Sequence, residues 1–74
     1  MGKLRVLSGK EVCGILSRRS FARIRQRGSH IVMQKIVKDS TITVPVPDHP
    51  ELKRGTLLGI IRQSRLPRRE FESR

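Results

Sequence analysis

The sequence contains very few aromatic residues: Phe21 and Phe71 are the only two, with no tyrosine and no tryptophan. Because aromatic side chains dominate the buried area of many small cores, this 74-residue chain must build its core mainly from leucine, isoleucine and valine. Aromatic rings are also the platforms on which single-stranded bases stack. A nucleic-acid-binding protein of this composition is therefore expected to rely on backbone contacts, with weak sequence preference.

Cysteine and long apolar stretches are scarce as well. The single cysteine, Cys13, has no partner for an internal disulfide, and no cysteine and histidine spacing resembles a zinc site. No apolar stretch approaches the ~20 residues of a membrane-spanning helix, and the N-terminus lacks the apolar region of a secretion signal. We expect one small domain over residues 1–74, soluble in the cytoplasm, with no metal, no small-molecule cofactor and no membrane association.

Acidic residues are also few in this sequence. Seventeen lysines and arginines stand against six aspartates and glutamates, which gives a formal net charge of +11, and twelve of the seventeen are arginine. The planar guanidinium group binds phosphate oxygens in pairs, which an ammonium group cannot do. A polyanion such as RNA is therefore the predicted partner, in preference to a basic surface that serves solubility alone.

Residues 8–19 carry the signals of an amphipathic helix. Ser8 and Glu11 have the spacing of a capping box, in which each side chain accepts a hydrogen bond from the backbone amide of the other residue. We predict a helix that begins at Gly9 and ends near residues 18 and 19, whose positive charge suits a helix C-terminus. Its apolar stripe consists of Val12, Ile15 and Leu16.

The following segment has the two-residue period of β-strands. The first predicted strand runs from Phe21 to Arg27 and carries a row of arginines that share one face by parity. The second runs from His30 to Val37, and the third from Thr41 to Val44, where Pro45 and Pro47 stop it. Three consecutive strands with short turns predict an antiparallel sheet.

A second helix is predicted after a proline-stiffened loop. Residues 57–61 are apolar at helical spacing, Thr56 is the expected N-cap, and the helix should end at about Gln63 or Ser64. A short helical turn should follow at Pro67. The order indicates an α+β fold, α-β-β-β-α, in which a three-stranded antiparallel sheet carries both helices on one face.

Four segments, taken in order, resemble the HicA family of bacterial toxins. They are LSGKEV at residues 7–12, RQRGSH at 25–30, ITVPVPDHPELKRGTL at 42–57 and IIRQSRLPRREF at 60–71. Each segment is a weak signal alone, but their order and spacing together are specific. The resemblance implies a fold like that of double-stranded-RNA-binding domains, and an mRNA-cleaving ribonuclease that a HicB-type antitoxin neutralises.

The chain departs from the family pattern near the end of the second helix. Members often carry a glycine there, where this chain has Arg65, and we therefore expect the helix to fray or run on. Gly59 inside the same helix costs about 1 kcal/mol relative to alanine. Both departures concern the rigidity of the C-terminal part and leave the expected chemistry unchanged.

His30 is the candidate catalytic residue. Cleavage of RNA by its own 2′-hydroxyl needs a base for the hydroxyl proton, an acid for the leaving 5′-oxygen, and positive charge at the phosphate. An imidazole exchanges a proton near neutral pH, and the neighbouring arginines supply the charge. From the residues alone, a surface histidine that at most contacts phosphate is the alternative interpretation. The resemblance assigns the family's catalytic histidine to His30, whereas His49 matches no catalytic role.

The candidate RNA-binding residues form two groups. The first follows the first strand and its turn: Arg23, Arg25, Arg27, Gly28 and Ser29. Glycine permits a positive φ, which would let a phosphate approach the backbone of the turn. The second group, Lys53 and Arg54, precedes a helix N-terminus, where free amides favour anions.

Three functions fit these features. The favoured one is a metal-independent endoribonuclease toxin that acts on mRNA. A non-catalytic RNA-binding module of the same fold would bind RNA equally but would not cleave it. A basic protein-interaction subunit would instead need an acidic protein surface as its partner.

Overall fold

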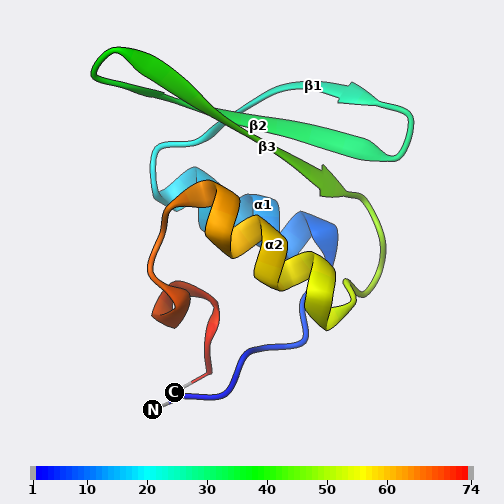
Figure 1. Cartoon of the computed structure of the whole chain (residues 1–74). Helices are drawn as coiled ribbons and strands as arrows, with labels where there is room; N and C mark the ends of the chain where they lie inside the picture. Colours follow the sequence, from blue (N-terminus) through cyan, green and yellow to red (C-terminus); the bar gives the residue numbers. More distant parts are fainter. Residues whose placement is uncertain (1, 74) are drawn as a thin grey trace.

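The computed structural model describes residues 2–73. Their elements are, in order, α1 (Gly9–Arg18), β1 (Ala22–Arg27), β2 (His30–Val37), β3 (Ser40–Pro47), α2 (Arg54–Ser64) and the 3₁₀ helix η1 (Arg68–Phe71). The antiparallel sheet has the order β1-β2-β3, and both helices cover the same face of it (Figure 1). The predicted α+β fold with the order α-β-β-β-α is confirmed. No helix within residues 2–73 has the length and apolar character needed to cross a membrane.

The capping box at the start of α1 forms as predicted. The Ser8 hydroxyl accepts from the Glu11 amide at 3.0 Å, and the Glu11 carboxylate accepts from the Ser8 amide at 2.8 Å. The hydrogen bond from the Ser8 backbone, followed by that with its side chain, holds the pKa of the Glu11 carboxyl below its usual range. The helix therefore begins at Gly9, and the apolar stripe predicted for it is buried.

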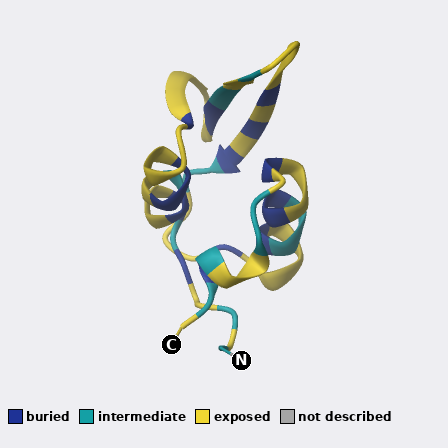
Figure 2. Cartoon of the chain, turned by 90° about the vertical axis from the view of Figure 1, so that its left-hand side faces the viewer, coloured by how far each residue is buried: buried dark blue, intermediate teal, exposed yellow. Residues whose placement is uncertain are grey.

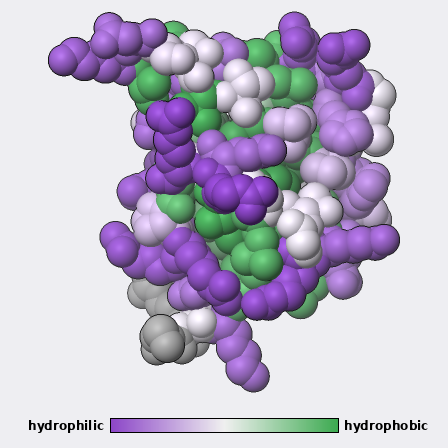
Figure 3. Space-filling view, in the orientation of Figure 1, coloured by the Kyte–Doolittle hydropathy of each residue, from purple (hydrophilic) through white to green (hydrophobic). Residues whose placement is uncertain are grey.

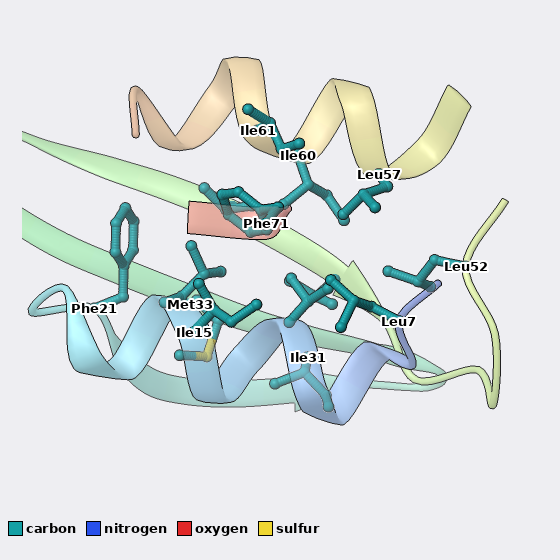
Figure 4. Close-up of a cluster of buried hydrophobic side chains, with 14 of the residues drawn as sticks. Leu7, Ile15, Phe21, Ile31, Met33, Leu52, Leu57, Ile60, Ile61 and Phe71 are labelled. Atoms are coloured by element: carbon teal, nitrogen blue, oxygen red, sulfur yellow. The ribbon is translucent and has the colours of Figure 1, made fainter. Parts of the chain in front are cut away.

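One hydrophobic core fills the space between the sheet and the two helices. The residues of this core include members of both helices and of strands β2 and β3, and β3 shows alternating buried and exposed bands (Figure 2). Phe71 of η1 is fully buried and points into the core toward Ile60 of α2 (Figure 4). Phe21, predicted as the first residue of a strand, precedes β1, and its ring is buried at the edge of the same core.

The third strand is longer than predicted. Pro45 and Pro47 do not stop it, because β3 continues through both prolines to residue 47 and pairs with β2 along its whole length. A proline has no N–H to donate, but β3 is an edge strand with a neighbour on one side only. Since the two prolines alternate along the strand, their nitrogens face the same side. Because both nitrogens face away from β2, the absence of their N–H groups leaves the pairing with β2 intact.

The bounds of α2 differ from the prediction at its start and agree at its end. Thr56 is not the N-cap: Lys53 is, without a side-chain hydrogen bond, and its carbonyl accepts from the amide of Leu57 at 3.0 Å. The helix ends at Ser64 because Arg65 takes the left-handed conformation usual for glycine, with φ 61°. The expectation that the helix would fray or run on is therefore wrong.

Candidate functional site

The face of the sheet opposite the helices, here called the open face, carries the candidate catalytic residue. The register pairs β2 residues with β3 residues on the same face, and Ile31 and Met33 belong to the helix-covered core. Their neighbours His30 and Val32 therefore point to the open face. His30 is exposed and lies between Arg27 of β1 and Pro47 of β3, its two partners across the sheet.

A cavity of about 600 Å³ lies on the open face around His30. This basic cavity is lined by two arginines of β1, the glycine of the turn, and residues of β2 and β3, namely Arg25, Arg27, Gly28, His30, Val32, Thr43 and Pro45. Val32 lies between Arg25 and Pro45 across the sheet, and only 7% of its surface is exposed, although it lies outside the hydrophobic core. An apolar floor with basic walls suits a ligand that combines phosphate with sugar or base.

The turn that leads into His30 is a two-residue hairpin connection. Gly28 has φ 58°, and no other part of the described chain lies within 4 Å of where a Cβ would be. A positive φ at the first central residue is the feature of type II′ hairpin turns, which match the twist of the flanking strands. The carbonyl of Ser29 accepts from the Asp48 amide at 2.6 Å, so Ser29 is tied to the loop after β3 and does not line the cavity.

The arginine row predicted for the first strand is broken by a β-bulge. Arg23 pairs with Met33 and Arg25 pairs with Val32, so that the extra residue Ile24 shifts the register between them. Arg25 and Arg27 lie on the open face, whereas Arg23 lies on the helix side. The prediction that all three share one face is therefore wrong, because parity holds only in a regular strand.

One hydrogen bond and one electrostatic effect agree with the position of Arg23. Its guanidinium donates to the side-chain oxygen of Gln26, which pairs with the core residue Ile31. Partial burial raises the pKa of the Cys13 thiol on α1, and the positive charge of Arg23 counteracts part of that rise. Arg23 therefore lies near α1 and not in the basic cavity.

Lys53 and Arg54 do not join the basic cavity either. Lys53 is the N-cap of α2 and Arg54 its first residue, and both line a separate cavity of about 180 Å³ together with the N-terminal residues Leu4, Arg5 and Val6. The structure thus brings four predicted site residues together: Arg25, Arg27, Gly28 and His30. Sequence reasoning missed the β3 contribution to this cavity. Pro45 lay beyond the predicted end of that strand, and Thr43 lay within the strand but was not assigned to the site.

The charge of the basic cavity is not balanced within the described chain. Of the ion pairs in residues 2–73, one joins Arg19 to Glu70 and the other joins Arg68 to Glu72, and neither involves a residue of the cavity. Hydrophilic side chains project all around the outline of the molecule, with apolar atoms exposed between them (Figure 3). Arg25 and Arg27 are therefore free to pair with an anionic ligand.

Outside the basic cavity, the titratable residues of the described range 2–73 form no metal-binding cluster. The structure places no three histidine, cysteine, aspartate or glutamate side chains where they could hold a metal ion. The backbone carbonyl of His49 accepts from the Gly9 amide at 2.9 Å, which fixes the loop after β3 against the start of α1. His49 thus has a clear structural position, separate from the basic cavity.

Comparison with known proteins gives one family. Residues 9–66 match a family model described as the HicA toxin of bacterial toxin-antitoxin systems. No curated protein matches the chain. The match spans both helices and all three strands, and it includes every residue that lines the basic cavity.

Proposed function

The chain belongs to the HicA family of bacterial toxins, and on that premise we propose that it cleaves mRNA as a metal-independent endoribonuclease with His30 as its catalytic residue. Membership of the family supports a toxin role within a toxin–antitoxin pair. The observation that carries the finer proposal is the position of His30. Its exposed side chain borders a cavity whose two arginines have no acidic partner within residues 2–73.

The proposed reaction uses the 2′-hydroxyl of the RNA as the nucleophile. The imidazole of His30 takes the hydroxyl proton, the 2′-oxygen forms a bond to phosphorus, and the bond from phosphorus to the 5′-oxygen breaks. The leaving 5′-oxygen takes a proton from water, which reaches this exposed site freely. The products are one strand that ends in a 2′,3′-cyclic phosphate and one that begins with a 5′-hydroxyl.

Arg25 and Arg27 have the electrostatic role in this proposal. The phosphorane-like transition state carries more negative charge on its oxygens than the substrate does, and a guanidinium can donate two hydrogen bonds to them. Both groups are fixed by the strand β1 and point to the same cavity as His30. Gly28 would let the phosphate approach the turn closely. Ser29, Lys53 and Arg54 stay predictions as RNA contacts, and all three lie outside the basic cavity. The proposal includes no RNA contact from Arg23, because this residue lies on the helix side of β1.

The test is the substitution His30→Ala, with His49→Ala as the matched control. If His30 transfers protons, its loss should lower the cleavage rate by about 10²–10⁴-fold while RNA affinity stays nearly constant. The control removes the other histidine, which has a loop position, and should keep the wild-type rate. Wild-type cleavage should continue in excess EDTA and leave 2′,3′-cyclic phosphate ends. Equal cleavage by wild type and His30→Ala would refute the catalytic assignment.

A non-catalytic RNA-binding module is the second candidate, and one observation favours it. Within residues 2–73 no hydrogen bond or ion pair orients the His30 imidazole, whereas a general base is commonly held by a third group. Under this alternative, purified wild type would bind RNA and leave it uncut. The same assay therefore separates the two functions.

We further infer that the partner is a HicB-type antitoxin with an acidic surface. The unbalanced charges of Arg25 and Arg27 and the open face around them would attract such a surface, as charge complementarity favours. A partner bound there would cover His30 and exclude the substrate.

A further inference from the structure

A second cavity lies next to the basic cavity, and the proposed reaction assigns no role to it. Helix α2 packs against the edge strand β3 (Figure 1). Residues of β3 and α2, together with His30, line a groove of about 260 Å³. Two residues, His30 and Pro45, line both this groove and the basic cavity. A ligand whose reacting phosphate lies at His30 can therefore extend from the basic cavity into the groove.

The basic cavity and the groove differ in chemistry. The basic cavity presents Arg25 and Arg27, whereas no lysine, arginine, aspartate or glutamate lines the groove. Apolar surface in the groove comes from Pro45, Pro47 and Ile60, and hydrogen-bonding groups come from Thr56 and Gln63 of α2. Phosphates prefer the arginines. A flat, partly apolar ring with amide-like edges fits neutral walls that carry one hydroxyl and one carboxamide.

The face of α2 toward the groove is open because of Gly59. A Cβ at this position would meet only the end of the Arg62 side chain, at 4.0 Å, so packing within the described chain does not require a glycine. A glycine inside a helix is nevertheless unfavourable relative to alanine. Thr56, Gly59 and Gln63 follow at intervals of three and four residues and share one side of the helix.

We propose that the groove between β3 and α2 binds the nucleobase next to the cleaved phosphate, and that Thr56 and Gln63 determine which base is accepted there. The inference rests on the proposed ribonuclease function and deepens it. It also changes one expectation from the sequence: the scarcity of aromatic residues predicts weak sequence preference overall, whereas the groove adds a preference at one position beside the cut. Contact with the remaining nucleotides would stay with their phosphates.

The experiment maps cleavage sites on an RNA of mixed sequence by sequencing the cut ends. Wild type should prefer one base, or one pair of similar bases, at one position beside the cut. Gln63→Leu removes the carboxamide at similar size and Thr56→Val removes the hydroxyl. Each should reduce the preference, measured as the ratio of kcat/KM for two bases, by roughly five- to tenfold, which is the usual effect of one hydrogen bond. Thr41→Val, on the open face but outside the basic cavity and the groove, is the matched control and should keep the preference.

A third variant tests the space of the groove. Gly59→Leu would fill the groove and should lower kcat/KM at every cleavage site, and by more than Gly59→Ala, which adds only one methyl group to the groove. Urea denaturation of both variants verifies that the fold is intact. The substitutions at the exposed residues Thr56 and Gln63 test the role of the groove even if a Gly59 variant does not fold.

Each contrary result is distinguishable. If wild type cleaves and Gln63→Leu and Thr56→Val keep its base preference, the groove proposal is wrong while the ribonuclease function stands. If these variants weaken only the binding of the antitoxin, the groove is a protein-binding surface and the proposal is again wrong. If wild type does not cleave RNA at all, both the function and the groove proposal are overturned.

Discussion

Replacing single arginines of β1 by glutamine tests whether RNA binds to the open face. Arg25 and Arg27 line the basic cavity, whereas the bulge at Ile24 turns Arg23 to the helix side. Each substitution removes one positive charge from the same strand, so nonspecific effects of net charge are equal. Only the position of the guanidinium differs, which makes Arg23→Gln the matched control for Arg25→Gln and Arg27→Gln.

The expected magnitude follows from counterion release. Each arginine–phosphate contact to single-stranded RNA contributes about 0.7 to the slope of log K against log salt concentration. Arg25→Gln or Arg27→Gln should therefore reduce the slope by about 0.7, and the double variant by about 1.4. When salt rises fourfold, wild-type binding should weaken about 2.6-fold more than that of a single variant, and about sevenfold more than that of the double variant. Arg23→Gln should leave the slope close to that of wild type.

The assay is the fluorescence anisotropy of a labelled single-stranded RNA, titrated at several salt concentrations. All variants carry His30→Ala in addition, so that the RNA stays intact during the titration. An equal loss of slope in Arg23→Gln and Arg25→Gln would refute the assignment of the open face, because it would mean that binding follows total charge. A nearly flat salt dependence in the parent protein would exclude arginine–phosphate contacts as the source of affinity.

Three further predictions concern packing and the partner. Gly9→Ala should reduce the free energy of unfolding in urea by about 1–3 kcal/mol, because its Cβ would lie 2.0 Å from the carbonyl oxygen of Pro47; unchanged stability would show that α1 can shift away from β3. Arg65→Gly should stabilise the protein by about 1 kcal/mol and raise its melting temperature by roughly 4–8 °C, since glycine adopts the left-handed conformation without strain; a lower melting temperature would contradict this. Addition of a HicB-type antitoxin should suppress RNA cleavage, and the double substitution Arg25→Gln and Arg27→Gln should weaken the complex. A stable complex that cleaves RNA as fast as the free protein would show that the antitoxin does not cover the active site.

Several elements followed from local sequence because neighbouring residues alone determine them. The capping box of Ser8 and Glu11 needs only a spacing of three residues, and the helix begins where it predicts. The hairpin at Gly28 needs only a residue that tolerates positive φ. The second strand was predicted with its observed bounds, His30 to Val37, because isoleucine, valine and methionine are frequent there and turn residues flank it on both sides.

Local rules failed where a distant part of the chain sets the outcome. Ser64 is buried, donates its hydroxyl to the carbonyl of Ile61 at 2.8 Å, and accepts from the amide of Leu66 at 3.2 Å. These bonds and the burial of Phe71 in the core hold the chain after α2, so that Arg65 can keep a conformation that an isolated peptide would disfavour. The sequence predicted the end of the helix at Gln63 or Ser64, but no pattern within the helix indicates that Arg65 takes the left-handed conformation there.

The sequence by itself determined the order of elements, the basic character and the exposed histidine at the start of the second strand, because turns, caps and alternation act between near neighbours. Only the tertiary structure decided which arginines accompany that histidine. The bulge at Ile24 depends on how β1 pairs with β2, and one extra residue reverses the face on which Arg23 lies. Pro45 of β3 likewise became part of the site because that strand lies at the edge of the sheet, where a residue without an N–H group can keep its pairing with β2.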